Sequence, residues 1–148
     1  MATSDSIVII PTYNEKENIE NIIRAVFGLE KVFHILIIED NSPDGTADIV
    51  RRLQKEFPER LFMVERKGKQ GLGTAYIAGF KWAIENKYDY VFEMDADFSH
   101  NPNDLPRLYN KCAEEGYDVA IGSRYVSGVN VVNWPMGRVL MSYFASKY

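Results

Sequence analysis

The chain has 148 residues, of which 46% are hydrophobic and 26% charged, and its formal net charge is −4. Length and composition predict about one globular domain, with a hydrophobic core large enough to be stable without disulfide bonds or other cross-links. One cysteine and two histidines exclude a disulfide framework and a structural zinc site of the Cys/His type. The negative charge argues against nucleic-acid binding, and no apolar run reaches the ~20 residues that a membrane span needs.

Short apolar runs alternate along the chain with segments of helical periodicity. Strands are predicted at 7–10, 35–38, 61–64, 90–94 and 119–121, and helices within 19–27, 47–57, 75–83 and 105–112. Asn14 and Glu17 predict a capping box before the first helix. This order predicts an α/β fold, with right-handed crossovers and a mostly parallel central sheet flanked by helices. Ligands of such sheets bind at the carboxyl ends of the strands.

Polar residues follow the first two predicted strands. Pro11, Tyr13 and Glu15 suit either a plain turn or a nucleoside site, in which the ring stacks on a base and the carboxylate bonds its edge. Glu39 and Asp40 begin the segment E-D-N-S-P-D-G-T, most of which turns and a helix cap explain. The two acids are not explained in this way, because burying them is costly without donors. A ribose hydroxyl or a base N–H would satisfy Asp40.

Two carboxylates follow the fourth predicted strand in D-A-D-F-S-H. Asp95 and Asp97 are two residues apart, so in extended chain they point to the same side. Like charges this close disfavour each other's ionised form unless a cation lies between them. Mg²⁺ or Mn²⁺ is typically held by one or two carboxylates and substrate phosphates, so the segment predicts a metal site, with a solvated loop as the alternative. His100 is interpreted as a turn or cap residue.

Basic residues occur in two further places. The stretch R-K-G-K-Q-G-L-G-T at 66–74 matches neither the dinucleotide nor the P-loop pattern, and suits a phosphate-facing loop or a solvated turn equally well. Arg124 follows the fifth predicted strand, and Arg138 begins an apolar segment at 139–144. As a pair, the two guanidinium groups are able to hold phosphate oxygens bidentately, whereas Arg138 alone suits a surface position.

Taken in order, these segments resemble family 2 glycosyltransferases, which have the nucleotide-sugar-binding GT-A fold, and among them the polyprenyl-phosphate (dolichyl-type) mannose synthases. The matching stretches are P-T-Y-N-E, D-N-S-P-D-G-T, G-L-G-T-A-Y, D-A-D-F-S-H and G-S-R-Y-V. D-x-D alone is a weak signal, but the ordered set is specific. Glu39 departs from the family, which often has Asp at this position.

The resemblance implies transfer of mannose from GDP-mannose to a polyprenyl phosphate, with inversion and with Mg²⁺ or Mn²⁺ as cofactor. Its implied nucleotide-sugar contacts are Pro11, Tyr13, Glu15, Ile38, Asp40, Asp95, Ala96, Asp97 and Arg124. It also implies metal binding by Asp95 and Asp97 and catalytic roles for Asp97, Arg124 and Arg138. Alternatives are a family 2 transferase with another donor (UDP-glucose or similar) or a saccharide acceptor, a nucleotidyltransferase, and a non-catalytic nucleotide-binding fragment.

Domain organisation and location follow from the same reasoning. We expect residues 1–148 to form a single nucleotide-sugar-binding domain that is truncated at its C-terminal end, because similar enzymes continue with a segment that completes the acceptor site. The first six residues lack the regions of a signal peptide, which predicts a cytoplasmic protein. A lipid acceptor then requires peripheral contact with the inner membrane face, for which Arg138 and the apolar segment 139–144 are candidates.

Overall fold

The computed structural model describes residues 3–117, 120–122 and 129–131. Arg124, Arg138 and the apolar segment 139–144 lie outside the described residues, so the expectations for them stay predictions. The chain divides into two compact units, Met1–Pro102 and Asn103–Tyr148.

The first unit contains a parallel sheet of four strands. These are β1 (Ser6–Thr12), β2 (His34–Glu39), β3 (Leu61–Glu65) and β4 (Tyr90–Glu93), in the order β3-β2-β1-β4. Every residue of β2 and all but one of β1 are buried, as expected for continuous apolar runs at the centre of a parallel sheet. The predicted parallel sheet and the first four predicted strands are confirmed.

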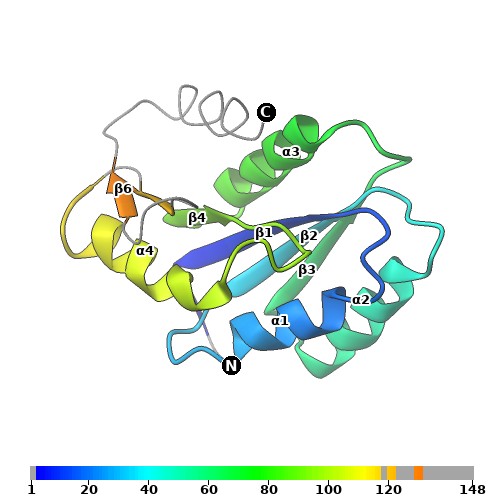
Figure 1. Ribbon diagram of the computed structural model, residues 1–148, viewed down its shortest axis with the longest axis horizontal. Coiled ribbons are helices and arrows are strands. Elements are labelled where there is room, and N and C mark those ends of the chain that lie inside the picture. Colours follow the sequence, from blue (N-terminus) through cyan, green and yellow to red (C-terminus); the bar gives the residue numbers. More distant parts are fainter. Residues whose placement is uncertain (1–2, 118–119, 123–128, 132–148) are drawn as a thin grey trace. The chain divides into compact units, whose positions relative to one another are not determined.

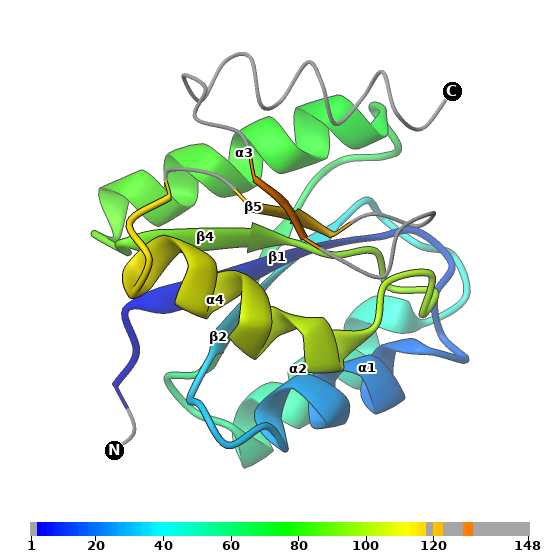
Figure 2. The same ribbon diagram turned by 60° about the vertical axis from the view of Figure 1, so that its left-hand side comes forward.

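Helices cover both faces of this sheet. Helices α1 (Ile19–Phe27) and α2 (Thr46–Glu56) lie on one face, and α3 (Leu72–Glu85) lies on the other (Figures 1 and 2). The chain moves from β1 to β3 in one direction and then crosses back over the opposite face, so that β4 pairs with β1. The direction of winding therefore reverses between β1 and β4, which is the place where open α/β sheets bind their ligands.

Two glycines determine how α3 begins and how closely it packs. Gly71 precedes the helix with φ +98°, a backbone conformation that glycine adopts without steric cost. A Cβ at Gly79 would lie 2.6 Å from Cγ2 of Ile9, so glycine lets α3 approach β1 closely. Tyr76, one turn before Gly79, is completely buried on the inner face of the helix.

The predicted capping box before α1 is wrong. Helix α1 begins at Ile19, and Asn14 lies well before it in the left-handed region with φ 56°. Asparagine tolerates this conformation, and the Asn14 N–H donates to Oγ of Ser42 at 2.9 Å. Asn14 thus takes part in a contact between two loops and does not cap helix α1.

The second unit contains helix α4 (Leu105–Ala113), which follows a 3₁₀ turn at Pro102–Asp104. Strands β5 (Ala120–Gly122) and β6 (Val129–Val131) form an antiparallel pair. The helix and the fifth strand are confirmed. Strand β6 was not predicted, because three residues are too few to show a hydrophobic pattern typical of a strand. In the described part of the chain, no helix combines the length and apolar character needed to cross a bilayer.

Candidate functional site

A cavity of about 210 Å³ opens at the carboxyl end of the first unit's sheet, where the winding reverses. Its lining residues end β1, follow one of the four strands, or lie at the start of α3; they are Pro11, Thr12, Tyr13, Glu15, Asp40, Lys69, Gly71, Leu72, Ala75, Asp95, Ala96 and Asp97. The structure therefore brings together seven predicted contact residues from three separate motifs. Ile38 is completely buried within β2 and does not line this cavity.

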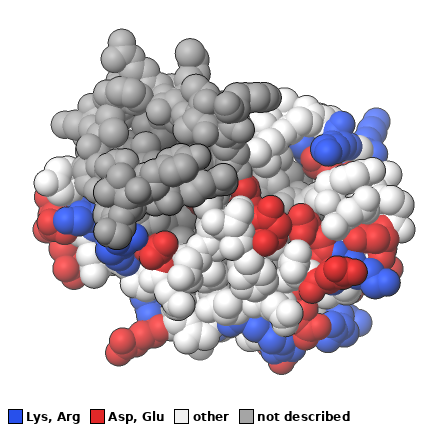
Figure 3. Space-filling view, in the orientation of Figure 1, with Lys and Arg blue, Asp and Glu red and all other residues white. Residues whose placement is uncertain are grey.

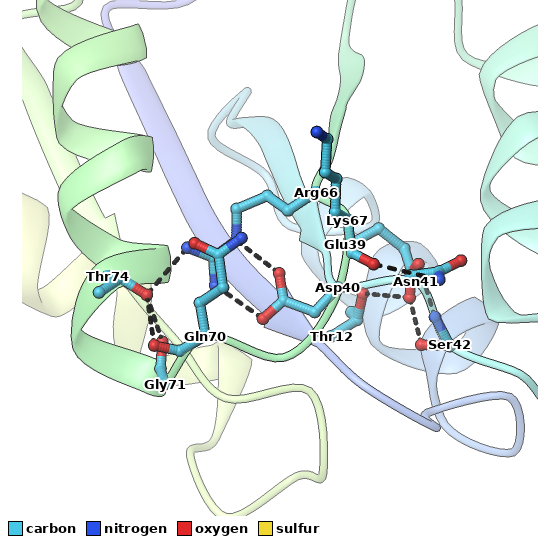
Figure 4. Close-up of polar contacts among 10 residues, drawn as sticks. All are labelled: Thr12, Glu39, Asp40, Asn41, Ser42, Arg66, Lys67, Gln70, Gly71 and Thr74. Carbon is cyan, nitrogen blue, oxygen red and sulfur yellow. Dashed lines mark hydrogen bonds and ion pairs between the residues drawn. The ribbon is translucent and has the colours of Figure 1, made fainter.

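Asp40 is held by Arg66 in a largely buried bidentate ion pair. Nε of Arg66 donates to Oδ1 at 2.6 Å and Nη2 donates to Oδ2 at 2.7 Å (Figure 4). The pair follows from strand register, because Glu39 lies opposite Glu65 and the next residue of each strand is then adjacent. Nη1 of Arg66 also donates to Oγ1 of Thr74 at 2.9 Å, which fixes the guanidinium against the start of α3.

Glu39 is buried and its carboxylate is satisfied within the protein. It accepts hydrogen bonds from Oγ1 of Thr12 at 3.3 Å, from the backbone N–H of Ser42 at 3.0 Å and from the Ser42 hydroxyl (Figure 4). These donors answer the question that the sequence raised about the cost of burying Glu39. Its role is to position the turn that follows β2.

The D-N-S-P-D-G-T motif holds the loop between β1 and α1. Three consecutive backbone N–H groups, those of residues 14–16, donate to Oγ of Ser42 (2.9 Å), Oγ1 of Thr46 (3.1 Å) and Oδ2 of Asp44 (3.1 Å), in that order. We call Ser42, Asp44 and Thr46 the loop brace. The Thr46 hydroxyl donates onward to Asp44 at 2.5 Å. Burial raises the pKa of Asp44, but hydrogen bonds from Thr46 and from the backbone of Lys16 outweigh it and lower the pKa overall.

Negative charge is concentrated at the cavity. Burial raises the pKa of Glu15, a hydrogen bond from Asn18 opposes this, and the charges of Asp97, Asp44 and Asp95 raise the pKa further. On the part of the described surface that Figure 3 shows, several acidic side chains lie next to one another. A divalent cation would offset this repulsion, so the donor set fits a hard metal ion with oxygen ligands.

The two D-A-D carboxylates are oriented by neighbouring groups. Asp95 accepts from the Tyr76 hydroxyl at 3.0 Å and from Oγ of Ser99 at 3.4 Å, and Asp97 accepts from the Ser99 N–H at 2.9 Å. The N–H of Asp95 donates to Nδ1 of His100 at 3.2 Å, so the imidazole closes the turn after β4, in line with its interpretation as a turn residue. Within the described residues no three or more His, Cys, Asp or Glu side chains form a ready metal cluster. Two carboxylates completed by ligand phosphates is the usual arrangement for Mg²⁺.

The basic loop after β3 borders the cavity. Lys69 is a lining residue, and its Nζ lies 5.2 Å from the centre of the Tyr13 ring. Of the two interpretations that the sequence left open, a loop at the ligand site agrees better with this position. Arg66, Lys69 and Tyr76 were not among the predicted contact residues. Arg66 directly follows a parallel strand, as Asp40 does, and that position was the available signal.

Comparison with known proteins identifies the family to which this chain is similar. Residues 7–147 match the family model described as "Glycosyl transferase family 2". Polyprenol monophosphomannose synthase of Mycolicibacterium smegmatis is 45% identical over 146 residues, 99% of this chain and 55% of that protein. Undecaprenyl-phosphate mannosyltransferase of Micrococcus luteus is 43% identical over 142 residues, 96% of this chain and 57% of that protein. The chain thus spans about half the length of these curated relatives.

Solved structures show the same architecture. A mannosyltransferase from Pyrobaculum calidifontis, in complex with GDP-Man and Mn²⁺, superposes with a TM-score of 0.51 and 27% identity over 55% of this chain and 25% of that one. TarS 1–349 of S. aureus gives a TM-score of 0.65 over 84% of this chain and 38% of that one; its 22% identity carries the fold alone. The predicted α/β GT-A fold is confirmed.

Proposed function

Because the chain belongs to glycosyl transferase family 2, we propose that it is the donor-binding part of a transferase that moves mannose from GDP-mannose to a polyprenyl phosphate with inversion. The names of the two curated relatives support the sugar and the acceptor, and the Pyrobaculum calidifontis complex supports the donor and the metal. The observation that carries the proposal is the cavity at the winding reversal, which collects an aromatic ring, a paired acid and the two D-A-D carboxylates.

The nucleoside would bind where β1, β2 and β3 end. Tyr13 is 39% exposed at the cavity, so its ring is available for stacking on a base. Asp40 uses both oxygens for Arg66, yet each carboxylate oxygen has a second lone pair that can accept from a base N–H or a ribose hydroxyl. In this proposal Pro11, Glu15 and Ala96, which also line the cavity, complete the contacts implied by the family, whereas the buried Ile38 is assigned no side-chain contact.

The diphosphate would lie along D-A-D, with a divalent ion held by Asp95 and Asp97. When bound, Mg²⁺ or Mn²⁺ stabilises the charge that grows on the GDP leaving group as the glycosidic bond breaks. The contribution of the chain is orientation. Asp95 and Asp97 are fixed by hydrogen bonds from Tyr76 and Ser99 before any ligand arrives.

Transfer to a phosphate needs no general base. A phosphate monoester has a second pKa of about 6 and is mostly dianionic near neutral pH. Its oxygen attacks the anomeric carbon from the side opposite GDP, the new C–O bond forms, and GDP leaves with the electron pair of the broken bond. We assign Arg124 and Arg138 to holding the acceptor phosphate in line. The lipid acceptor places the reaction at a membrane surface, for which we propose peripheral contact from the cytoplasmic side.

A thermal-shift panel tests the donor. GDP, UDP, GDP-mannose and UDP-glucose are each added with and without Mn²⁺, and a ligand at 100 times its Kd adds about 2.7 kcal/mol of stability. We expect GDP and GDP-mannose to raise the melting temperature most, and more with Mn²⁺. A larger shift with UDP-glucose would replace GDP-mannose as the donor. The acceptor is tested in a chain extended to the length of the relatives, with labelled GDP-mannose and either polyprenyl phosphate or free polyprenol. Equal labelling of the free alcohol would refute transfer to phosphate.

A further inference from the structure

Tyr76 is a completely buried phenol whose hydroxyl reaches the candidate metal site. Its side chain has 0% exposure, and its OH donates to Oδ1 of Asp95 at 3.0 Å. The residue belongs to G-L-G-T-A-Y, a motif to which the sequence analysis assigned no chemical role. Tyr76 does not line the cavity, but its neighbour Ala75 and its hydrogen-bond partner Asp95 both do.

The geometry gives this hydroxyl a defined effect on Asp95. A hydrogen bond to a carboxylate is charge-assisted and fixes the plane in which the two oxygens lie. The phenol itself is tightly enclosed, because it is fully buried on the inner face of α3, one turn before the close approach of Gly79 to Ile9. Ser99 donates to the other oxygen of Asp95 from a longer distance, 3.4 Å. Tyr76 is therefore the better-placed of these two donors to set the direction of the Asp95 lone pairs.

We propose that Tyr76 is a positioning residue for the metal: its hydroxyl holds Asp95 in the orientation that receives the divalent ion of the nucleotide diphosphate. This rests on the proposed function, in which Asp95 and Asp97 hold that ion. Partners that orient a metal ligand in this way change metal affinity by about 10-fold to 100-fold when they are removed. Tyr76 does not touch substrate in this account.

The test is Tyr76→Phe, which removes the hydroxyl and keeps the ring that fills the core. The 148-residue chain is titrated with GDP by isothermal calorimetry, once with Mn²⁺ and once with EDTA. The ratio of the two affinities measures how much the metal contributes to binding. We expect this ratio to fall about 10-fold or more in Tyr76→Phe, while affinity in EDTA stays unchanged.

Tyr88→Phe is the matched control. Its hydroxyl lies 2.7 Å from Nδ1 of His34, at the amino ends of the strands, so the same atom is deleted away from the candidate metal site. An unchanged ratio in Tyr76→Phe, whatever the stability of the two variants, would mean that the Tyr76 hydroxyl does not act on the metal site, and would overturn the proposal. A wild-type chain whose GDP affinity does not depend on Mn²⁺ would instead overturn the metal assignment in the proposed function. The two failures are thus distinguishable.

Discussion

The ion pair between Asp40 and Arg66 makes a quantitative prediction about stability. The two side chains are only 7% and 11% exposed, and two short hydrogen bonds join them. Removing one partner of such a pair leaves a buried charge without its counterion, at a cost of about 3–5 kcal/mol. For a chain of this size, about 3 kcal/mol corresponds to a fall of roughly 6–12 °C in melting temperature.

A double-mutant cycle isolates the pair. Asp40→Ala and Arg66→Met are made singly and together, and urea denaturation gives the free energy of unfolding of each variant. Asp40→Ala leaves the Arg66 guanidinium without a counterion, whereas the double variant has no charged group left at either position. We therefore expect the double variant to lose less than the sum of the two single losses, with a coupling of about 2 kcal/mol. Additive single effects would refute the view that the two charges stabilise each other.

Nucleotide binding by the same variants separates two roles of Asp40. Asp40→Ala is expected to weaken GDP and GDP-mannose by the same factor, since the proposed contact is to the nucleoside that both share. The affinities are compared under conditions in which each variant is folded, as judged from its urea curve. A loss confined to GDP-mannose would move Asp40 from the nucleoside to the sugar.

Three further substitutions test the loop brace, the metal carboxylates and the charge at the cavity. Thr46→Val removes the hydrogen bonds that join the Thr46 hydroxyl to the Glu15 N–H and to Asp44. Urea denaturation should therefore show that the free energy of unfolding falls by about 2–3 kcal/mol, and Thr46→Ser should mostly avoid this loss. A Val variant as stable as wild type would contradict the role of the loop brace. Asp97→Ala should abolish the Mn²⁺-dependent part of GDP affinity in calorimetry and leave the ligand-free melting temperature unchanged; undiminished dependence on Mn²⁺ would exclude Asp97 as a ligand. Glu15 has a raised pKa, so its contribution to stability is fully present below its unfolded value near 4.5 and is lost as pH rises through the folded value. Glu15→Gln should therefore raise the melting temperature at pH 7 and have little effect at pH 4, and the opposite trend would refute the sign.

The local hydrophobic pattern of the sequence was sufficient to predict most of the helices and strands. Continuous β-branched runs and helical spacing predict the central strands and α1 to α4 to within a few residues, because each of these elements buries an apolar face of its own period. The capping box failed because Asn14 and Glu17 match a local rule, while the Asn14 N–H is taken by Ser42, 28 residues away. The three-residue strand β6 has no period to detect.

The candidate site was predictable where a side chain directly follows an apolar strand. Tyr13 and Asp40 directly follow β1 and β2, Pro11 and Asp95 lie within two residues of a strand end, and all four line the cavity. The pairing of Asp40 with Arg66 spans 26 residues and depends on β3 lying beside β2, so only the strand order reveals it. Sequence reasoning therefore identified Asp40 as a buried acid in need of donors, but it did not foresee Arg66, which supplies two of those donors before any ligand binds.

Residues that hold the cavity in shape without lining it have a consequence for donor selectivity. Ser42, Thr46 and Tyr76 act on the cavity through hydrogen bonds to other residues, and none of the three lines it. Substituting them displaces a loop or a carboxylate that every nucleotide donor would meet, so GDP and UDP should weaken together. A change of preference between the two bases must instead come from side chains that face the base. Of the described residues, Tyr13 and Lys69 fit this condition best, because the ammonium lies over the ring at the cavity wall. The strength of donor binding is therefore expected to depend on Ser42, Thr46 and Tyr76, and the preference between bases on Tyr13 and Lys69.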